Sequence, residues 1–200
     1  MSADLRRHSV AFFIEPVLAG HDRGNFEIFC YSNSAHADAV TERLKSFADQ
    51  WREVFSLDDE ALANLVREDG IDILVDLSGF SANNRLTAFA CKPAPVQATW
   101  LGYPTTTGMQ QMDYRISDWA VDPEGADGLN VERVVRLPGS YFCYGGPGLE
   151  PEVGTLPGLR EGRITLGSFN SLSKIGEETM RLWIRVLHAL PESRLLLKSG

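Results

Sequence analysis

Apolar runs alternate with amphipathic segments along most of the chain. Near-continuous apolar runs, typical of strands buried on both faces of a sheet, occupy residues 26–32, 71–77, 96–101, 114–117, 164–169 and 194–198. Apolar positions at helical spacing predict helices over residues 9–19, 36–49, 58–68, 84–91 and 177–190. Strands that alternate with helices indicate βαβ units, a parallel sheet and an α/β fold with helices on both faces.

Three residues predict where helices begin or end. Pro16 should end or kink the first helix, because proline has no backbone N–H to donate. Ser56 is a plausible N-cap for the helix over 58–68, and Gly70 suits the turn that leads from this helix into the next strand.

The chain changes character after residue 122, where glycine and proline become dense. Such runs cannot hold a regular helix or ladder, which indicates a linker. We therefore expect an N-terminal domain over residues 1–145, a linker over 146–162, and the beginning of a second Rossmann-like domain over 163–200. The last predicted strand has no helix after it, so the second domain is expected to be truncated.

Composition narrows the function classes. The 200 residues carry a net charge of −8, which argues against nucleic-acid binding, because that affinity depends on cationic neutralisation of phosphates. Three widely spaced cysteines (Cys30, Cys91 and Cys143) indicate a reducing cytoplasm, and each is expected to be a small buried hydrophobe. No stretch approaches the roughly 20 apolar residues of a membrane span, so no membrane association is expected.

Three predicted strands are followed by loops of small or hydroxyl-bearing residues, over 78–81, 102–108 and 170–174. Ligands of open parallel sheets bind at the carboxyl ends of strands, where small side chains let backbone N–H groups approach an oxygen-rich ligand. Lys174, beside a predicted helix N-terminus, could hold a diphosphate. A solvated surface lysine is the alternative.

Among the histidines, His8 begins an apolar helix and could accept or relay a proton, although a helix-start or surface histidine explains the pattern as well. No histidine pair has metal-ligand spacing, so no metal is expected. The chain also contains no dinucleotide, Walker A or nucleophile-elbow motif. Trp100 and Tyr103 flank the second loop and could stack on a sugar or base.

Four blocks together resemble the bacterial SPINDLY-like O-linked N-acetylglucosamine transferases: RRHSVAFFIEPVLAGHD, FEIFCYSN, residues 69–118 with KPAPVQATWLGYP, and LGSFNSLSK. The resemblance spans almost the whole chain. It implies a GT-B glycosyltransferase with two Rossmann-like domains and UDP-GlcNAc bound in the cleft between them.

The same resemblance implies site residues. His8 matches the family's N-terminal histidine, either a catalytic base or an active-site organiser. The loop that borders the sugar maps to Leu101, Gly102, Tyr103 and Pro104. The loop that contacts the nucleotide maps to Asn170, Ser171 and Lys174, with the lysine on the diphosphate. Ser171 is shorter than the family's usual Gln or Asn, which weakens that contact.

The resemblance also defines what departs from the family. The upstream tetratricopeptide repeats, the first strand of the sheet and the downstream diphosphate-binding loop are expected to be missing. The implied reaction is inverting, metal-independent and cofactor-free transfer of N-acetylglucosamine from UDP-GlcNAc to Ser or Thr of an acceptor protein. Alternatives are a non-catalytic interaction or scaffold remnant and a related transferase with another UDP-sugar. The protein could form homo-oligomers or associate through the missing repeats.

Overall fold

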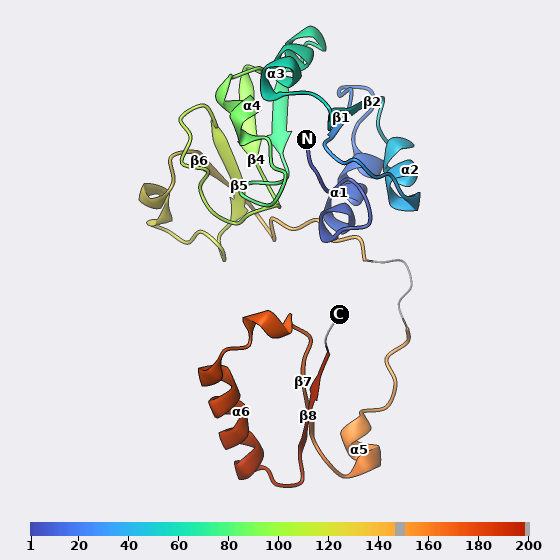
Figure 1. Cartoon of the computed structure of the whole chain (residues 1–200), viewed down its shortest axis with the longest axis vertical. Coiled ribbons are helices and arrows are strands. Elements are labelled where there is room, and N and C mark those ends of the chain that lie inside the picture. Colours follow the sequence, from blue (N-terminus) through green and yellow to red (C-terminus); the bar gives the residue numbers. More distant parts are fainter. Residues whose placement is uncertain (147–150, 199–200) are drawn as a thin grey trace. The chain divides into compact units, whose positions relative to one another are not determined.

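The computed structural model describes residues 1–146 and 151–198 (Figure 1). The chain divides into two compact units, Met1–Leu149 and Glu150–Gly200. Residues 147–150 of the predicted linker and Gly200 lie outside the described residues. The domain limits predicted at 145 and 163 therefore stay predictions.

The first unit alternates strands with helices, as the apolar pattern predicts. Its strands are β1 (Phe29–Ser32), β2 (Gln50–Glu53), β3 (Ile73–Asp76), β4 (Val96–Thr99), β5 (Tyr114–Asp118) and β6 (Arg133–Leu137). Its helices are α1 (Ser9–Gly20), α2 (Ala39–Lys45), α3 (Asp59–Glu68), α4 (Leu86–Ala90) and the 3-10 helix η1 (Ala126–Leu129). All paired strands run parallel, so the predicted parallel sheet is confirmed.

The two parts of this sheet, β2-β1 and β3-β4-β5-β6, are joined by the first residues of the chain. Met1 donates its amino group to the Val75 carbonyl and accepts from the Leu77 N–H. On the other side, Ser2 forms a parallel bridge with Ser32 of β1. The resulting order is β2, β1, Met1–Ser2, β3, β4, β5, β6. Strand order therefore reverses between Met1–Ser2 and β3.

Helices cover both faces of the sheet (Figure 1). On one face, α1 and α2 pack through Ile14 and Leu44 in a cluster that also contains Cys30 of β1. On the other face, α3 and α4 contribute Leu62 and Phe89 to a cluster with Tyr31, the next residue of β1. Each of the two clusters also contains apolar residues of β3. This assignment of neighbouring residues to opposite faces follows from the two-residue period of a strand.

The expectation that Pro16 ends or kinks the first helix is wrong as to its end, because α1 continues to Gly20. Proline cannot donate to the carbonyl of Phe12, four residues earlier. In the structure that carbonyl accepts a hydrogen bond of 2.9 Å from the Gly145 N–H instead. A segment distant in sequence thus replaces the missing bond, and the helix persists.

Other local predictions also needed correction. Asp58, rather than Ser56, caps α3 by accepting from the Ala61 N–H, whereas Gly70 adopts the expected left-handed conformation with φ of 67°. Cys30 is buried as predicted, but Cys91 and Cys143 are exposed. Their positions at a helix end and in an irregular segment place them outside the core.

Two strands and one helix escaped the sequence prediction. β2 and β6 mix polar and apolar residues, and their half-buried positions weaken the apolar signal. Within the predicted linker, Pro157 begins a one-turn helix, α5 (Pro157–Glu161), because proline is tolerated in the first helical turn. Gly162 ends this helix with φ of 66°.

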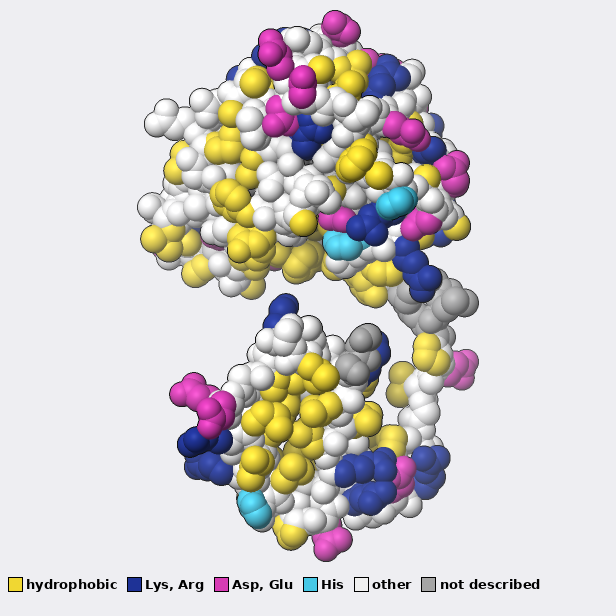
Figure 2. Space-filling model, viewed as in Figure 1, with side chains coloured by type: hydrophobic (Ala, Val, Ile, Leu, Met, Phe, Trp, Pro, Cys, Tyr) yellow, Lys and Arg dark blue, Asp and Glu magenta, His cyan; other side chains and the backbone are white. Residues whose placement is uncertain are grey.

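The second unit also contains β7 (Thr165–Ser168), the 3-10 helix η2 (Leu172–Lys174), α6 (Glu177–Ala189) and β8 (Arg194–Leu197). The strands pair parallel. None of residues 151–198 is buried, and hydrophobic side chains lie open over α6 and the two strands (Figure 2). A hollow of about 300 Å³ lined by Trp183 and Leu187 lies between them. Across the described ranges, every helix is too short or too polar to traverse a lipid bilayer.

Candidate functional site

The reversal of strand order in the first unit defines a rim at the carboxyl ends of its strands. In parallel sheets, ligands bind in the crevice where this reversal occurs. The chain leaves Met1–Ser2 toward His8, which precedes α1, and it leaves β3 toward the loop over residues 78–81. Sequences distant by about 70 residues are thus brought to the same edge.

His8 is the N-cap of α1, and this role constrains its imidazole. Its Nδ1 accepts a hydrogen bond of 3.3 Å from the Val10 N–H, and Asp4 Oδ2 lies 3.8 Å from the same nitrogen. A neutral ring that accepts at Nδ1 must carry its proton on Nε2. The side chain is 40% exposed. In this arrangement His8 offers an Nε2–H donor to a ligand.

The segment before His8 is held by α2. Asp38 accepts from the Arg7 N–H at 2.7 Å and caps α2 through the Val40 and Thr41 N–H groups. These backbone hydrogen bonds, first that of Thr41 and then that of Arg7, lower the pKa of Asp38. Thr41 donates its hydroxyl to the Leu5 carbonyl. Asp38 was not predicted as a site residue, because its only distinguishing feature in the sequence is its position just before a helix.

The loop after β3 is organised by Asp76, the last residue of β3, whose side chain is buried. Asp76 accepts from the Ser78 N–H at 3.0 Å, the Gly79 N–H at 2.8 Å and the Thr99 hydroxyl at 2.8 Å. Burial raises the pKa of Asp76, and these donors oppose that effect. Because carboxyl oxygens satisfy all three donors, the strand ends of β3 and β4 are tied to one another.

The loops after β3 and β4 interlock without space for larger residues. A Cβ on Gly102 would lie 2.3 Å from the Leu77 carbonyl oxygen, and one on Gly79 would lie 2.4 Å from Tyr103 Cβ. Gly102 is therefore required by the close approach of the backbone at Leu77 and Ser78, whether or not a ligand also approaches it. Phe80 and Tyr103 also meet edge to face, with centroids 5.9 Å apart.

Leu101 joins this loop to the beginning of α1. It packs against the apolar cluster that contains Leu5 and Val10, and it has φ of 66°. That left-handed conformation costs a residue with a side chain on the order of 1–2 kcal/mol, so the surrounding contacts must hold it. Tyr103 and Pro104 follow on the exposed surface.

Asn170, Ser171 and Lys174 belong to one loop of the second unit, between β7 and α6. Asn170 Oδ1 accepts from the Ser171 N–H at 2.9 Å, and the Ser171 hydroxyl lies 2.8 Å from that of Ser173. Lys174 ends η2, and its side chain is exposed. The structure thus groups the predicted residues into two sets, with His8 and residues 101–104 in the first unit.

Two further observations bear on ligands. A largely apolar cavity of about 670 Å³ lies mainly beside the amino ends of β1 and β3, so it does not coincide with the rim. Within residues 1–146 and 151–198, no three or more His, Cys, Asp or Glu side chains gather in a way that could hold a metal ion. The expected independence from metals stays a prediction.

Residues 1–146 match glycosyl transferase family 41. This chain belongs to that family. A probable UDP-N-acetylglucosamine–peptide N-acetylglucosaminyltransferase SPINDLY of Solanum lycopersicum is 44% identical over 99% of this chain and 22% of its own length. The rice counterpart is 45% identical with the same coverage. The chain therefore spans about a fifth of the length of these family 41 relatives.

A solved structure supports the fold assignment. A lysine-to-methionine mutant of the Thermobaculum terrenum O-GlcNAc transferase matches with a TM-score of 0.89 and 48% identity, over 98% of this chain and 37% of that chain. The predicted α/β fold of GT-B type is confirmed, as is the resemblance to the SPINDLY-like O-GlcNAc transferases. The family 41 match covers the rim of the first unit.

Proposed function

We propose that the protein is a glycosyltransferase that moves N-acetylglucosamine from UDP-GlcNAc to Ser or Thr hydroxyls of acceptor proteins. The observation that carries this proposal is family 41 membership together with relatives named as peptide N-acetylglucosaminyltransferases. The reaction is inverting and requires no metal or cofactor. The protein acts in the cytoplasm, and it self-associates or associates through tetratricopeptide repeats that lie outside these 200 residues.

In this proposal the first unit carries the sugar side of the site. His8 lies at the switch point of the sheet and presents Nε2–H outward, which suits a hydrogen bond to the sugar or a diphosphate oxygen. Acting as a base at Nε2 would require the other tautomer and the loss of the α1 cap, at a cost of about 1 kcal/mol. Leu101, Gly102, Tyr103 and Pro104 border the sugar.

The second unit carries the nucleotide side. Lys174, with Asn170 and Ser171 in the same loop, stabilises the charge that develops on the UDP leaving group. Fixed donors that face a developing charge are a major source of transition-state stabilisation. An exposed ammonium is available for this contact without breaking an internal ion pair among the described residues.

The proposal is tested by transfer of sugar from UDP-GlcNAc to a Ser/Thr peptide library, read by mass spectrometry. His8→Ala should lower turnover on the order of 100-fold, the usual scale for a group that hydrogen-bonds or transfers a proton in the transition state. The melting temperature should fall by only a few degrees, because loss of the α1 cap costs about 1 kcal/mol. His188→Ala is the matched control, because His188 is exposed and lies in the last turn of α6, which leads to the amino end of β8 rather than to the carboxyl ends of the strands. Turnover that is equal in the two variants would remove His8 from the site.

A second readout isolates the nucleotide contact. Isothermal titration with UDP should show binding that Lys174→Ala weakens at least tenfold, whereas Arg185→Ala, which removes an exposed cation from the middle of α6, should have little effect. Loss of one charge-assisted contact corresponds to about that change. Equal UDP affinity in all three proteins would contradict the assignment of Lys174.

One observation favours a binding module as a second candidate. Residues 151–198 include no buried side chain, so the described part of the nucleotide side has little internal support for precise positioning. The discriminating result is the UDP titration. No heat of binding at millimolar UDP, with acceptor peptides still bound, would favour an interaction module over a transferase.

A further inference from the structure

Two buried carboxylates lie at opposite ends of the exposed loop that follows β4. Asp76 is 2% exposed and Glu132 is 4% exposed. Asp76 holds Thr99, the last residue of β4. Glu132, just before β6, holds Thr106 and Thr107. The stretch between these anchors contains Leu101 to Thr105, so both ends of the loop are fixed from beneath the rim.

At the first anchor, each partner of Asp76 is a donor. The backbone N–H groups of Ser78 and Gly79 can only donate, and they donate to different oxygens of Asp76. An asparagine would place its NH2 group against one of these N–H groups, whichever way the amide faced. The site therefore requires a carboxylate, and an amide of the same size does not satisfy it.

At the second anchor, the Thr106 hydroxyl fixes the direction of its own hydrogen. Thr106 Oγ1 accepts from the Gly108 N–H at 3.0 Å and from the Val131 N–H at 3.3 Å. Its hydrogen is therefore donated to Glu132 Oε2, 2.6 Å away. Glu132 Oε1 accepts from the Thr107 N–H at 2.6 Å. An amide nitrogen at Oε2 would leave the Thr106 hydroxyl without an acceptor.

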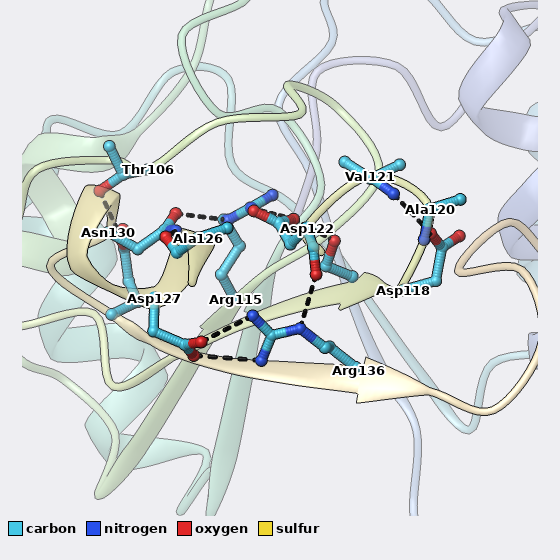
Figure 3. Close-up of polar contacts among 12 residues, drawn as sticks. Thr106, Arg115, Asp118, Ala120, Val121, Asp122, Ala126, Asp127, Asn130 and Arg136 are labelled. Atoms are coloured by element: carbon cyan, nitrogen blue, oxygen red, sulfur yellow. Dashed lines mark hydrogen bonds and ion pairs between the residues drawn. The ribbon is translucent and has the colours of Figure 1, made fainter. Parts of the chain in front are cut away.

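The element that carries Glu132 is itself braced. Figure 3 shows Arg136 of β6 reaching Asp127 and the Asp122 carbonyl, with Thr106 close to the Asn130 end of the same loop. Arg115 of β5 donates to Asn130 Oδ1 at 2.9 Å. Glu132 therefore extends from a rigid support, which is what a group that fixes another loop requires.

Between the anchors, the loop keeps a conformation that it would not adopt alone. Leu101 has positive φ, and Gly102 contacts the Leu77 carbonyl too closely for any side chain. Among the described residues, the N–H groups of Leu101 and Tyr103 make no hydrogen bond with the protein. A strained backbone with free donors persists where surrounding structure over-determines it.

We propose that Asp76 and Glu132 are positioning residues, which hold residues 101–105 in one conformation so that the backbone donors and Tyr103 meet the sugar nucleotide. This inference rests on the proposed function for its ligand. The physical claim about the loop is independent of that function, because the two anchors act whether or not a donor binds.

The test compares Asp76→Asn and Glu132→Gln with Asp69→Asn in the whole chain. The Asp69 side chain is only 10% exposed and pairs with Arg52. Asp69 precedes the amino end of β3, so its variant matches the loss of a largely buried carboxylate without touching the loop over 101–105. Hydrogen exchange of residues 100–108, followed by mass spectrometry, should become about tenfold faster in the first two variants, as expected for one lost buried hydrogen bond. It should stay near wild type in Asp69→Asn.

Enzyme kinetics supply the second readout. Both loop variants should raise the KM for UDP-GlcNAc about tenfold, since misplacing binding groups weakens donor capture, whereas Asp69→Asn should leave it near wild type. Loop exchange that is unchanged in Asp76→Asn and Glu132→Gln, or equally faster in Asp69→Asn, would overturn the inference. Faster loop exchange with an unchanged KM would also overturn it, because the loop would then not serve the donor. If wild-type protein does not use UDP-GlcNAc, the proposed function fails while the exchange result still decides the anchoring.

Discussion

The two units of this chain bury their apolar side chains to different extents. In Met1–Leu149, two apolar clusters lie on opposite faces of β1 and β3, and side chains such as Leu44 and Leu62 are completely buried. In the described part of the second unit, α6 covers one side of two strands and no residue is buried. Equivalent βα patterns in sequence thus give very different cores.

The difference shows that alternation of strands and helices specifies local structure but not stability. A strand gains most when it is covered on both faces, and apolar burial is the main favourable contribution to folding. β7 and β8 carry residues such as Leu196 that stay exposed. The second unit therefore has regular helices and strands, but it lacks the apolar burial that offsets the conformational entropy lost on folding.

The largest expected effect comes from separating the units. A fragment of residues 1–149 should unfold cooperatively, with a sharp thermal transition by circular dichroism, because its core lies within it. A fragment of residues 150–200 should show no cooperative transition, since below about 70 residues a small core rarely suffices. A cooperative transition of the short fragment would contradict this comparison.

A smaller effect is expected from trimming one leucine in each unit. Leu62→Ala should lower the free energy of unfolding by about 2–5 kcal/mol, the range for a fully buried leucine. Leu187→Ala, on the half-buried face of α6, should lower it by about 1 kcal/mol or less. Urea denaturation of both variants measures this. Equal losses would mean that the second unit is buried to the same degree.

The smallest effect concerns acid. Hydrogen bonds from the N–H groups of Tyr141, Val121 and Ala120 hold the pKa of Asp118 below its ordinary value. A lowered pKa in the folded state stabilises the first unit above about pH 4, the ordinary value, and this stabilisation is lost as pH falls through the folded pKa. The melting temperatures of wild type and Asp118→Asn should therefore converge as the pH falls below about 4. A constant difference would contradict this role of Asp118.

Much of the fold was predictable because buried strands leave a strong apolar signal. β3 and β4 were expected over 71–77 and 96–101, and both formed inside those ranges. β2 and β6 were not expected, because polar residues interrupt their short apolar runs. Pro16 misled for another reason: local chemistry predicts a missing hydrogen bond, but only the fold reveals that Gly145 replaces it.

The sequence allowed the loops of the site to be predicted better than the buried residues that hold those loops in place. The sequence placed the loops over 78–81 and 102–108 at one rim, and their contact through Gly79 and Tyr103 agrees with that placement. Nothing in the local pattern pointed to Glu132, which lies about 25 residues from the threonines that it holds. Anchors of this kind emerge only when distant strand ends are brought together.

The carbonyl left vacant by Pro16 has a mechanical consequence. Gly145 docks on the backbone of α1 itself, and a Cβ at Gly145 would lie 2.6 Å from the Pro16 ring. Residue 145 is thereby hydrogen-bonded to the middle of the helix whose first turn His8 caps. A substitution at Gly145 would therefore press on α1, the helix that positions the imidazole.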